Sequence, residues 1–141
     1  MIHQRISLLT VGAVNVKDLR SFYQKLGWEE TESSSDEYAV FKTAGVLLSI
    51  YPQEELERDS GLQFSAGGYK AISFSINVNE PQEVDQAMEG IREAGAEIIK
   101  EPHEAFWGGR IAYFADPEKN LWEIAWNPSS VFDERGAMLD F

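Results

Sequence analysis

The chain has 141 residues, contains no cysteine, and carries a net charge of −12 from 24 acidic and 12 basic residues. Its length suits one ordinary domain, or two small repeated halves that share a core. A chain without cysteine has no disulfide, no thiolate metal site and no cysteine nucleophile. The acidic charge disfavours nucleic acid and anionic membranes as partners.

The N-terminal residues Met-Ile-His-Gln-Arg lack the apolar stretch of a signal peptide. No apolar run in the sequence approaches the ~20 residues that a membrane-spanning helix needs. We therefore expect a cytoplasmic protein without a membrane partner.

The first half of the chain is predicted to form a strand, a helix and three further strands. Residues 6–14 are almost entirely apolar or small, which is typical of a buried strand, and Asn15 follows as a helix N-cap. Apolar side chains then recur at helical spacing at Leu19, Phe22, Tyr23 and Leu26. Gly27 ends this helix. The predicted strands lie at residues 28–31, 37–42 and 46–51.

The same order repeats after residues 53–68, a charged and then glycine- and serine-rich stretch that we interpret as a linker with a mobile tip. A strand is predicted at residues 71–78, followed by a helix with Asn79 as its N-cap and Gln82 in a capping box. Its apolar face is Val84, Ala87, Met88 and Ile91. Gly95 ends the helix, and residues 96–100 form the next predicted strand.

A predicted β-hairpin closes the second repeat. Residues 110–115 and 121–126 are rich in β-branched and aromatic side chains, and they flank an Asp-Pro-Glu-Lys-Asn turn. Alternation along the second strand places Leu121, Glu123 and Ala125 on one face. Glu123 must face water, take a partner or line a cavity, because burial of an unpaired carboxylate is costly.

This hairpin resembles the closing hairpin of the vicinal oxygen chelate superfamily, which contains glyoxalase I, extradiol dioxygenases and the bleomycin-resistance proteins. The resemblance lies in Asp116, Pro117, Asn120 and Glu123, while Lys119 stands where the family usually has glycine. A left-handed backbone at that position costs a lysine roughly 1 kcal/mol more than a glycine. The resemblance implies an α+β fold of tandem β-α-β-β-β modules, with two facing sheets around a cleft.

We therefore predict a single domain over residues 1–141, with modules at about 4–52 and 69–128, the linker at 53–68 and a C-terminal tail at 129–141. The tail is too apolar for a free end, so we expect it to pack on the body or on a second subunit. Its apolar residues are Val131, Phe132, Met138, Leu139 and Phe141. A homodimer is expected, with the tail or the linker at the contact.

In metal-dependent members, the resemblance implies four inward ligands, two from each module. Matching the module openings puts Leu8 and Ala71 at the first and third ligand positions, and aligning the final strands puts Leu48 at the second. Only Glu123 keeps a donor atom. One carboxylate cannot replace the hydration shell of zinc, nickel or iron, so we expect neither a metal nor another cofactor. The glyoxalase and dioxygenase mechanisms are therefore not supported.

The expected function is metal-independent binding of a small organic molecule, as the resemblance to bleomycin-resistance proteins implies. The acidic charge and four tryptophans favour a cationic or neutral aromatic ligand. The candidate binding residues are Glu123, Trp107, Tyr113, Tyr51, Thr10 and Ser73. The sequence does not fix which faces of their strands Tyr113 and Tyr51 occupy.

Three alternatives stay open at this point. The protein is a lyase, isomerase or hydrolase that uses Glu123 as general acid or base, or it is an interaction subunit with an unused cleft. Alternatively, Glu123 is structural and bonds to Arg110 or to a backbone donor. His3 and His103 lie away from the matched positions, and we interpret them as surface or loop residues.

Overall fold

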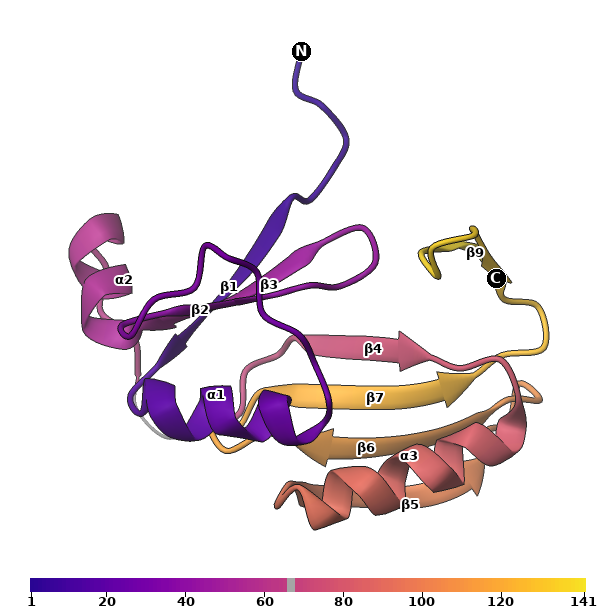
Figure 1. The fold of residues 1–141 in the computed structure, drawn as a ribbon. Coiled ribbons are helices and arrows are strands. Elements are labelled where there is room, and N and C mark those ends of the chain that lie inside the picture. Colours follow the sequence, from indigo (N-terminus) through magenta and orange to yellow (C-terminus); the bar gives the residue numbers. More distant parts are fainter. Residues whose placement is uncertain (66–67) are drawn as a thin grey trace. The chain divides into compact units, whose positions relative to one another are not determined.

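The computed structural model describes residues 1–65 and 68–141, and the chain divides into two compact units, Met1–Ser65 and Ala66–Phe141. The division falls inside the segment predicted as a linker. Each unit has its own mixed sheet (Figure 1), which agrees with the predicted α+β class. Within the described ranges, no helix is both long enough and apolar enough to cross a membrane.

The first unit is built on a three-stranded sheet of β1 (Leu8–Ala13), β3 (Leu47–Pro52) and β2 (Ala39–Phe41), in that order. β1 and β3 run parallel, and β2 is antiparallel to β3. Helix α1 (Val16–Lys25) connects β1 to the rest of the unit and buries Leu19, Phe22 and Tyr23. The apolar helical spacing thus identified the residues that α1 buries.

Asn15 caps α1 as predicted, because its side-chain oxygen accepts the Asp18 backbone N–H at 3.1 Å. The strand predicted at residues 28–31 is reduced to one isolated bridge between Glu30 and Phe41. Two side chains of this segment, Trp28 and Glu30, contact residues of α1. The centre of the Trp28 ring lies 5.2 Å from that of Tyr23. The carboxylate of Glu30 accepts hydrogen bonds from Nε and Nη2 of Arg20, each at 2.6 Å.

The prediction of a linker is wrong for the first half of residues 53–68, since Gln53–Ser60 form helix α2. The charged run that suggested a loop consists largely of Gln, Glu, Leu and Arg, which all have high helix propensity. Gly61 ends this helix in the left-handed conformation, with φ +74°. The predicted mobile tip of the linker includes residues 66–67, which lie outside the described ranges.

The second unit holds a four-stranded sheet in the order β4-β7-β6-β5. The strands are β4 (Ser73–Asn77), β5 (Glu97–Glu104), β6 (Arg110–Ala115) and β7 (Leu121–Trp126). β4 is parallel to β7, whereas β7, β6 and β5 are antiparallel to their neighbours. Helix α3 (Pro81–Glu93) packs against β5, β6 and β7 through Val84, Met88 and Ile91 (Figure 1).

The start of α3 and the length of β5 differ from the prediction. Glu80 is the N-cap instead of Asn79, and Glu83 replaces Gln82 in the capping box, with its carboxylate 2.7 Å from the Glu80 backbone nitrogen. A Pro81 at the first helical position shifts the start by one residue. β5 extends through Glu104, past the predicted end at Lys100, because the antiparallel pairing with β6 continues through bulges.

The turn between β6 and β7 is held by the buried carboxylate of Asp116, which is 3% exposed. It accepts the backbone N–H groups of Glu118 and Asn120 at 3.0 and 2.9 Å, and the Asn120 side-chain amide at 2.8 Å. Lys119 has φ +61°, which places a lysine in the left-handed region at the position where glycine was expected. The hairpin predicted from sequence is thus confirmed, and Lys119 adopts the left-handed backbone that usually calls for glycine.

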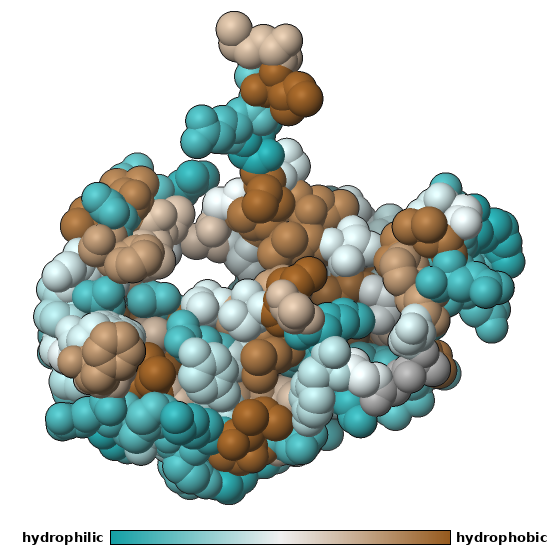
Figure 2. All heavy atoms as spheres, turned by 180° about the vertical axis from the view of Figure 1, so that it is seen from behind, coloured by the Kyte–Doolittle hydropathy of each residue, from teal (hydrophilic) through white to brown (hydrophobic). Residues whose placement is uncertain are grey.

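The C-terminal tail forms a small antiparallel hairpin of β8 (Val131–Phe132) and β9 (Met138–Asp140), drawn in yellow in Figure 1. Several of its apolar side chains are exposed, among them Leu139 at 66% and Phe141 at 72%. Apolar side chains are also visible as brown spheres on the N-terminal segment at the top of Figure 2. Each end of the chain therefore exposes apolar side chains.

Candidate functional site

Strand β7 divides its side chains between the face beneath α3 and the opposite face of the sheet. Trp122 and Ile124 are buried at 6% and 1% exposure, and the Trp122 ring stacks on Phe114 with centroids 6.1 Å apart. These side chains form the core beneath α3. Because neighbours alternate along a strand, Glu123 lies on the opposite face, as the sequence predicted.

Three polar side chains meet on that opposite face, one from each of three adjacent strands. Register places Ser75 of β4 and Tyr113 of β6 directly beside Glu123 of β7. The Ser75 hydroxyl donates to Glu123 Oε1 at 2.9 Å, and the Tyr113 hydroxyl donates to Oε2 at 2.7 Å. We call Ser75, Tyr113 and Glu123 the carboxylate cluster.

The hydrogen bond to Glu123 raises the pKa of Tyr113 to about 12, with burial as a second cause. A phenolate beside a carboxylate would lose the donated proton and face a like charge, so the neutral phenol is favoured. Tyr113 therefore stays a hydrogen-bond donor throughout the physiological pH range. Both partners of Glu123 are uncharged, so they leave the negative charge of the cluster uncompensated.

Arg110 does not neutralise this charge, contrary to one of the open alternatives. Its guanidinium binds Asp85 of α3 instead, with Nε and Nη2 at 2.6 and 2.7 Å from the two carboxylate oxygens. This pairing lowers the pKa of Asp85 through the hydrogen bond from Arg110. Among the described residues, Glu123 has no basic partner. Its carboxylate accepts hydrogen bonds from the hydroxyls of Ser75 and Tyr113.

In the first unit, the sheet face opposite α1 carries Thr10 and Tyr51, two of the predicted site residues. Thr10 pairs with Ser49 in the register, and their hydroxyl oxygens lie 2.7 Å apart. Tyr51 pairs with Gly12 and donates from its hydroxyl to Asp59 of α2 at 3.1 Å. Helix α2 covers the end of this face, because a Cβ at Gly12 would lie 3.3 Å from Leu56.

The register corrects two of the predicted metal-ligand assignments, Leu48 and Ala71, and it shows which serine lies beside Glu123. Leu48 is buried beneath α1 at 3% exposure, so the outward residue of β3 that corresponds to Glu123 is Ser49. Ala71 precedes β4, and Ser73 pairs with Leu121 while Ser75 pairs with Glu123. The predicted site residue Ser73 therefore lies two positions from the carboxylate, and Ser75 was missed although strand alternation puts both serines on one face.

Trp107 belongs to the turn between β5 and β6 and is 43% exposed. Its ring packs over Gly109, in the space that a Cβ on that residue would occupy. The turn is closed by Gly108, whose backbone N–H donates to the Ala105 carbonyl at 3.0 Å, with φ +97°. Trp107 therefore packs against its own turn, and among the described residues it has no hydrogen bond to the carboxylate cluster.

The side chains at the positions expected for metal ligands do not fit a transition metal. Leu8, Leu48 and Ala71 have no donor atom, and Ser49, the neighbour of Leu48, is a neutral hydroxyl already bonded to Thr10. Zinc, nickel and iron sites use imidazole, thiolate or several carboxylates, not hydroxyls beside a single carboxylate. Nowhere in residues 1–65 and 68–141 do three His, Cys, Asp or Glu side chains gather closely enough to hold an ion.

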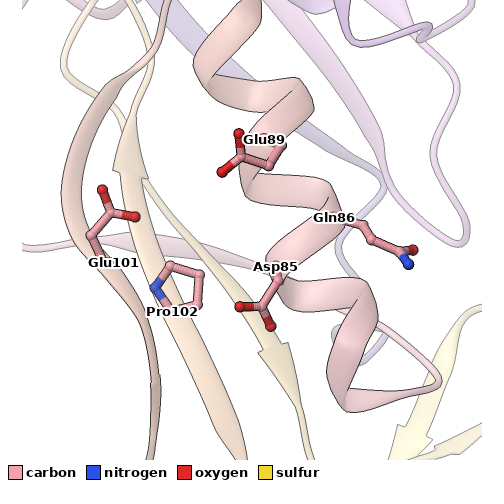
Figure 3. A pocket seen from close by; sticks show the side chains of 5 residues that line it. All are labelled: Asp85, Gln86, Glu89, Glu101 and Pro102. Carbon is pink, nitrogen blue, oxygen red and sulfur yellow. The ribbon is translucent and has the colours of Figure 1, made fainter.

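Two of the hollows in the described part of the second unit have linings that do not include Glu123. One of about 400 Å³ lies between α3 and β5, where Asp85, Glu89 and Glu101 gather with Gln86 and Pro102 (Figure 3). Asp85 is paired with Arg110, and Glu101 is paired with Arg92 at 2.7 Å. The other, of about 240 Å³, lies beside the first turn of α3, where Phe132 of the tail meets Trp126 and Pro128.

Solved structures with this fold cover nearly the whole chain. A glyoxalase-related enzyme from Fulvimarina pelagi is 24% identical, with a TM-score of 0.91 over 98% of this chain and 99% of that chain. A glyoxalase/bleomycin resistance protein/dioxygenase family enzyme from Burkholderia phytofirmans PsJN is 25% identical, with a TM-score of 0.76 over 86% and 98% of the two chains.

Sequence comparison leads to the same family. The uncharacterized protein YraH of Bacillus subtilis (strain 168) is 27% identical over 105 residues, which cover 70% of this chain and 76% of that protein. The model of one family matches residues 5–124. The chain therefore belongs to the Glyoxalase/Bleomycin resistance protein/Dioxygenase superfamily.

Proposed function

We propose that this protein binds a small cationic or neutral aromatic molecule without a metal, at the sheet face that carries Glu123. The observation that carries the proposal is the carboxylate cluster, in which two neutral hydroxyls orient a carboxylate and no basic side chain among the described residues neutralises it. A cation or an N–H donor of the ligand would give the Glu123 carboxylate the partner that the protein itself does not provide.

The overall charge supports the same class of ligand. With a net charge of −12, the protein attracts cations over a distance and repels anions. Such attraction is screened by salt, whose Debye length is about 8 Å at physiological ionic strength. Affinity for a cationic ligand should therefore fall as salt is added, whereas affinity for a neutral analogue should change little.

The contacts of Glu123 favour binding over the alternative of acid or base catalysis. Both of its carboxylate oxygens already accept a hydroxyl, at 2.9 and 2.7 Å, so a proton taken from a substrate has to compete with these donors. Tyr113 is a poor acid, because its pKa is raised to about 12. The cluster is thus suited to holding a charge in place.

Isothermal titration calorimetry on a panel of cationic, neutral and anionic aromatic molecules tests the proposal. We expect cations to bind best and the substitution Glu123→Gln to weaken them at least about tenfold, which corresponds to about 1.4 kcal/mol. The matched control is Glu97→Gln. Glu97 is an exposed carboxylate that also accepts a tyrosine hydroxyl, from Tyr69 at 2.7 Å, and its substitution changes the net charge equally.

Two results would contradict the proposal. Anions that bind as tightly as cations would show that the charge of Glu123 does not select the ligand. Equal effects of Glu123→Gln and Glu97→Gln would show that only the net charge matters. Metal content measured on the same samples checks metal independence, since stoichiometric zinc, nickel or iron that is lost in Glu123→Ala would contradict it.

We also propose that the protein is a homodimer in which the C-terminal hairpin contributes to the contact. The exposed apolar side chains of β8, β9 and the last residue support this, with Val131, Leu139 and Phe141 at 50%, 66% and 72% exposure. Light scattering over a dilution series should give twice the mass of the 15.9 kDa chain. A monomer mass at all concentrations would contradict the dimer, and Leu139→Ser should shift the equilibrium towards the monomer.

A further inference from the structure

The two hydroxyls of the carboxylate cluster determine which acceptor directions Glu123 has left. A carboxylate has two oxygens, and each oxygen can accept about two hydrogen bonds. Ser75 occupies one direction on Oε1 and Tyr113 one on Oε2. Glu123 therefore keeps one acceptor direction on each oxygen.

The remaining directions are available side by side. In the strand order β4-β7-β6, Ser75 and Tyr113 flank Glu123 from opposite neighbours of β7. Their hydroxyls reach the carboxylate from its two flanks, on the same face of the sheet. With a donor on each flank, we take the remaining acceptor direction of each oxygen to lie at the outer edge of the carboxylate.

We propose that the ligand group recognised at Glu123 is a planar cation with two parallel N–H donors, that is, an amidinium or a guanidinium. Two parallel N–H groups match the two acceptor directions of a carboxylate edge in a bidentate pair. This inference rests on the function proposed above and narrows its ligand class. A primary ammonium ion carries the same charge but offers it as a point, without the planar pair of donors.

The neighbours of Glu123 on the same face suit a flat group. Two positions away along β7 lie Leu121 and Ala125, and the register places Ala115 and Ile111 of β6 beside them. None of these aliphatic side chains is a competing donor. Ala115 and Ala125 are buried at 0% and 4% exposure, so Leu121 and Ile111, which are half-buried, give the apolar surface to the ring that carries the cation. The cluster therefore combines one polar edge with an apolar surround.

The test compares three ligands with the same ring on the full-length chain. Benzamidine has the planar pair of N–H donors, benzylamine has the same charge as an ammonium ion, and benzamide is neutral. By calorimetry at fixed pH and ionic strength, we expect benzamidine to bind about tenfold more tightly than benzylamine, because a bidentate pair replaces a point contact. Benzamide should bind most weakly, and Glu123→Gln should abolish the preference.

Substitution of the flanking donors tests whether they direct the ligand. Tyr113→Phe leaves the charge of Glu123 intact but frees the carboxylate to rotate, so the preference for benzamidine over benzylamine should fall to about threefold or less. Tyr69→Phe removes the hydroxyl of another tyrosine–glutamate pair and should leave the preference unchanged. Thermal unfolding of each variant shows that it is folded under the conditions of the titration.

The outcomes separate this inference from the proposed function. If benzamidine and benzylamine bind equally and Glu123→Gln weakens both, the planar-cation inference is overturned while cation binding at Glu123 stands. If no ligand responds to Glu123→Gln, the proposed function fails as well. A preference that survives Tyr113→Phe unchanged would overturn the role given to the flanking hydroxyls.

Discussion

Tyr113 and Glu123 occupy directly paired positions on β6 and β7, and the phenol donates to the carboxylate at 2.7 Å. The pair closes one side of the carboxylate cluster and joins two strands by their side chains as well as by their backbones. Because this contact raises the pKa of Tyr113 only in the folded protein, folding and the ionisation of Tyr113 depend on each other.

The first prediction concerns stability at alkaline pH. The pKa of Tyr113 is raised from 10.0 to about 12 in the folded state, so its contribution to stability is complete below pH 10 and is lost as pH rises from 10 to 12. Urea unfolding between pH 8 and pH 11 should show a decline above pH 10 that Tyr113→Phe makes shallower. At pH 7 the same substitution should cost about 1 kcal/mol. Tyr69→Phe should change the decline less, because its hydrogen bond to Glu97 is exposed.

A second prediction concerns the contact of α2 with the first sheet. A Cβ at Gly12 would lie 3.3 Å from Leu56 and 3.5 Å from the Cα of Gln53, so Gly12→Val crowds this contact and should cost about 1–3 kcal/mol in the free energy of unfolding. Gly90 provides a matched control, since it lies inside α3 and a Cβ there meets nothing within 4 Å. Gly90→Ala should stabilise the protein by roughly 0.5–1 kcal/mol. Equal effects at the two sites in chemical denaturation would contradict the role of Leu56.

A third prediction concerns Lys119 and its positive φ of +61°. Lys119→Gly and Lys119→Ala both remove the ammonium group that lies 5.6 Å from the centre of the Tyr69 ring. Only glycine relieves the left-handed backbone, so the glycine variant should be more stable than the alanine variant by about 1 kcal/mol. Melting temperatures of the two variants decide this, and a more stable alanine variant would mean that the turn rearranges.

A fourth prediction concerns the carboxylate that organises the same turn. Asp116→Ala leaves two backbone N–H groups and the buried Asn120 amide without their acceptor, and it should cost roughly 2–4 kcal/mol. Asp116→Asn retains an acceptor oxygen but turns one carboxylate oxygen into a donor, so its cost should be intermediate. A loss below 1 kcal/mol for the alanine variant, by urea denaturation, would show that the backbone alone holds the turn.

Sequence reasoning located Glu123 on the correct face but assigned two of its counterparts wrongly, and the difference has a physical cause. In a hairpin, the turn fixes the register, so alternation along residues 121–126 suffices to place Glu123. β4 pairs with β7 in parallel, and no local turn sets that register. Ser73 and Ser75 therefore looked equivalent, and only the fold shows which of them meets the carboxylate.

The error at Leu48 shows how sensitive such assignments are. A shift of one residue along a strand moves a side chain from one face to the other. Leu48 faces the core beneath α1, whereas Ser49, which is also buried at 5% exposure, lies on the opposite face of the sheet. Neighbouring apolar residues at Leu47 and Leu48 give no alternation that distinguishes the faces. The helix faces were predicted well, because three or four apolar positions define a stripe even if one is misjudged.

The different ranges of the two contacts of Glu123 have a consequence for how the second unit assembles. Tyr113 is 10 residues from Glu123, across a single turn, whereas Ser75 is 48 residues away, beyond α3 and two strands. Contacts that close short loops generally form before those that close long ones. We expect mutations in the Asp116 turn to slow refolding, and Ser75→Ala to act mainly on the unfolding rate. A chain that has just formed the β6–β7 hairpin would then hold a loosely oriented Glu123 carboxylate, which acquires its final direction only when β4 docks.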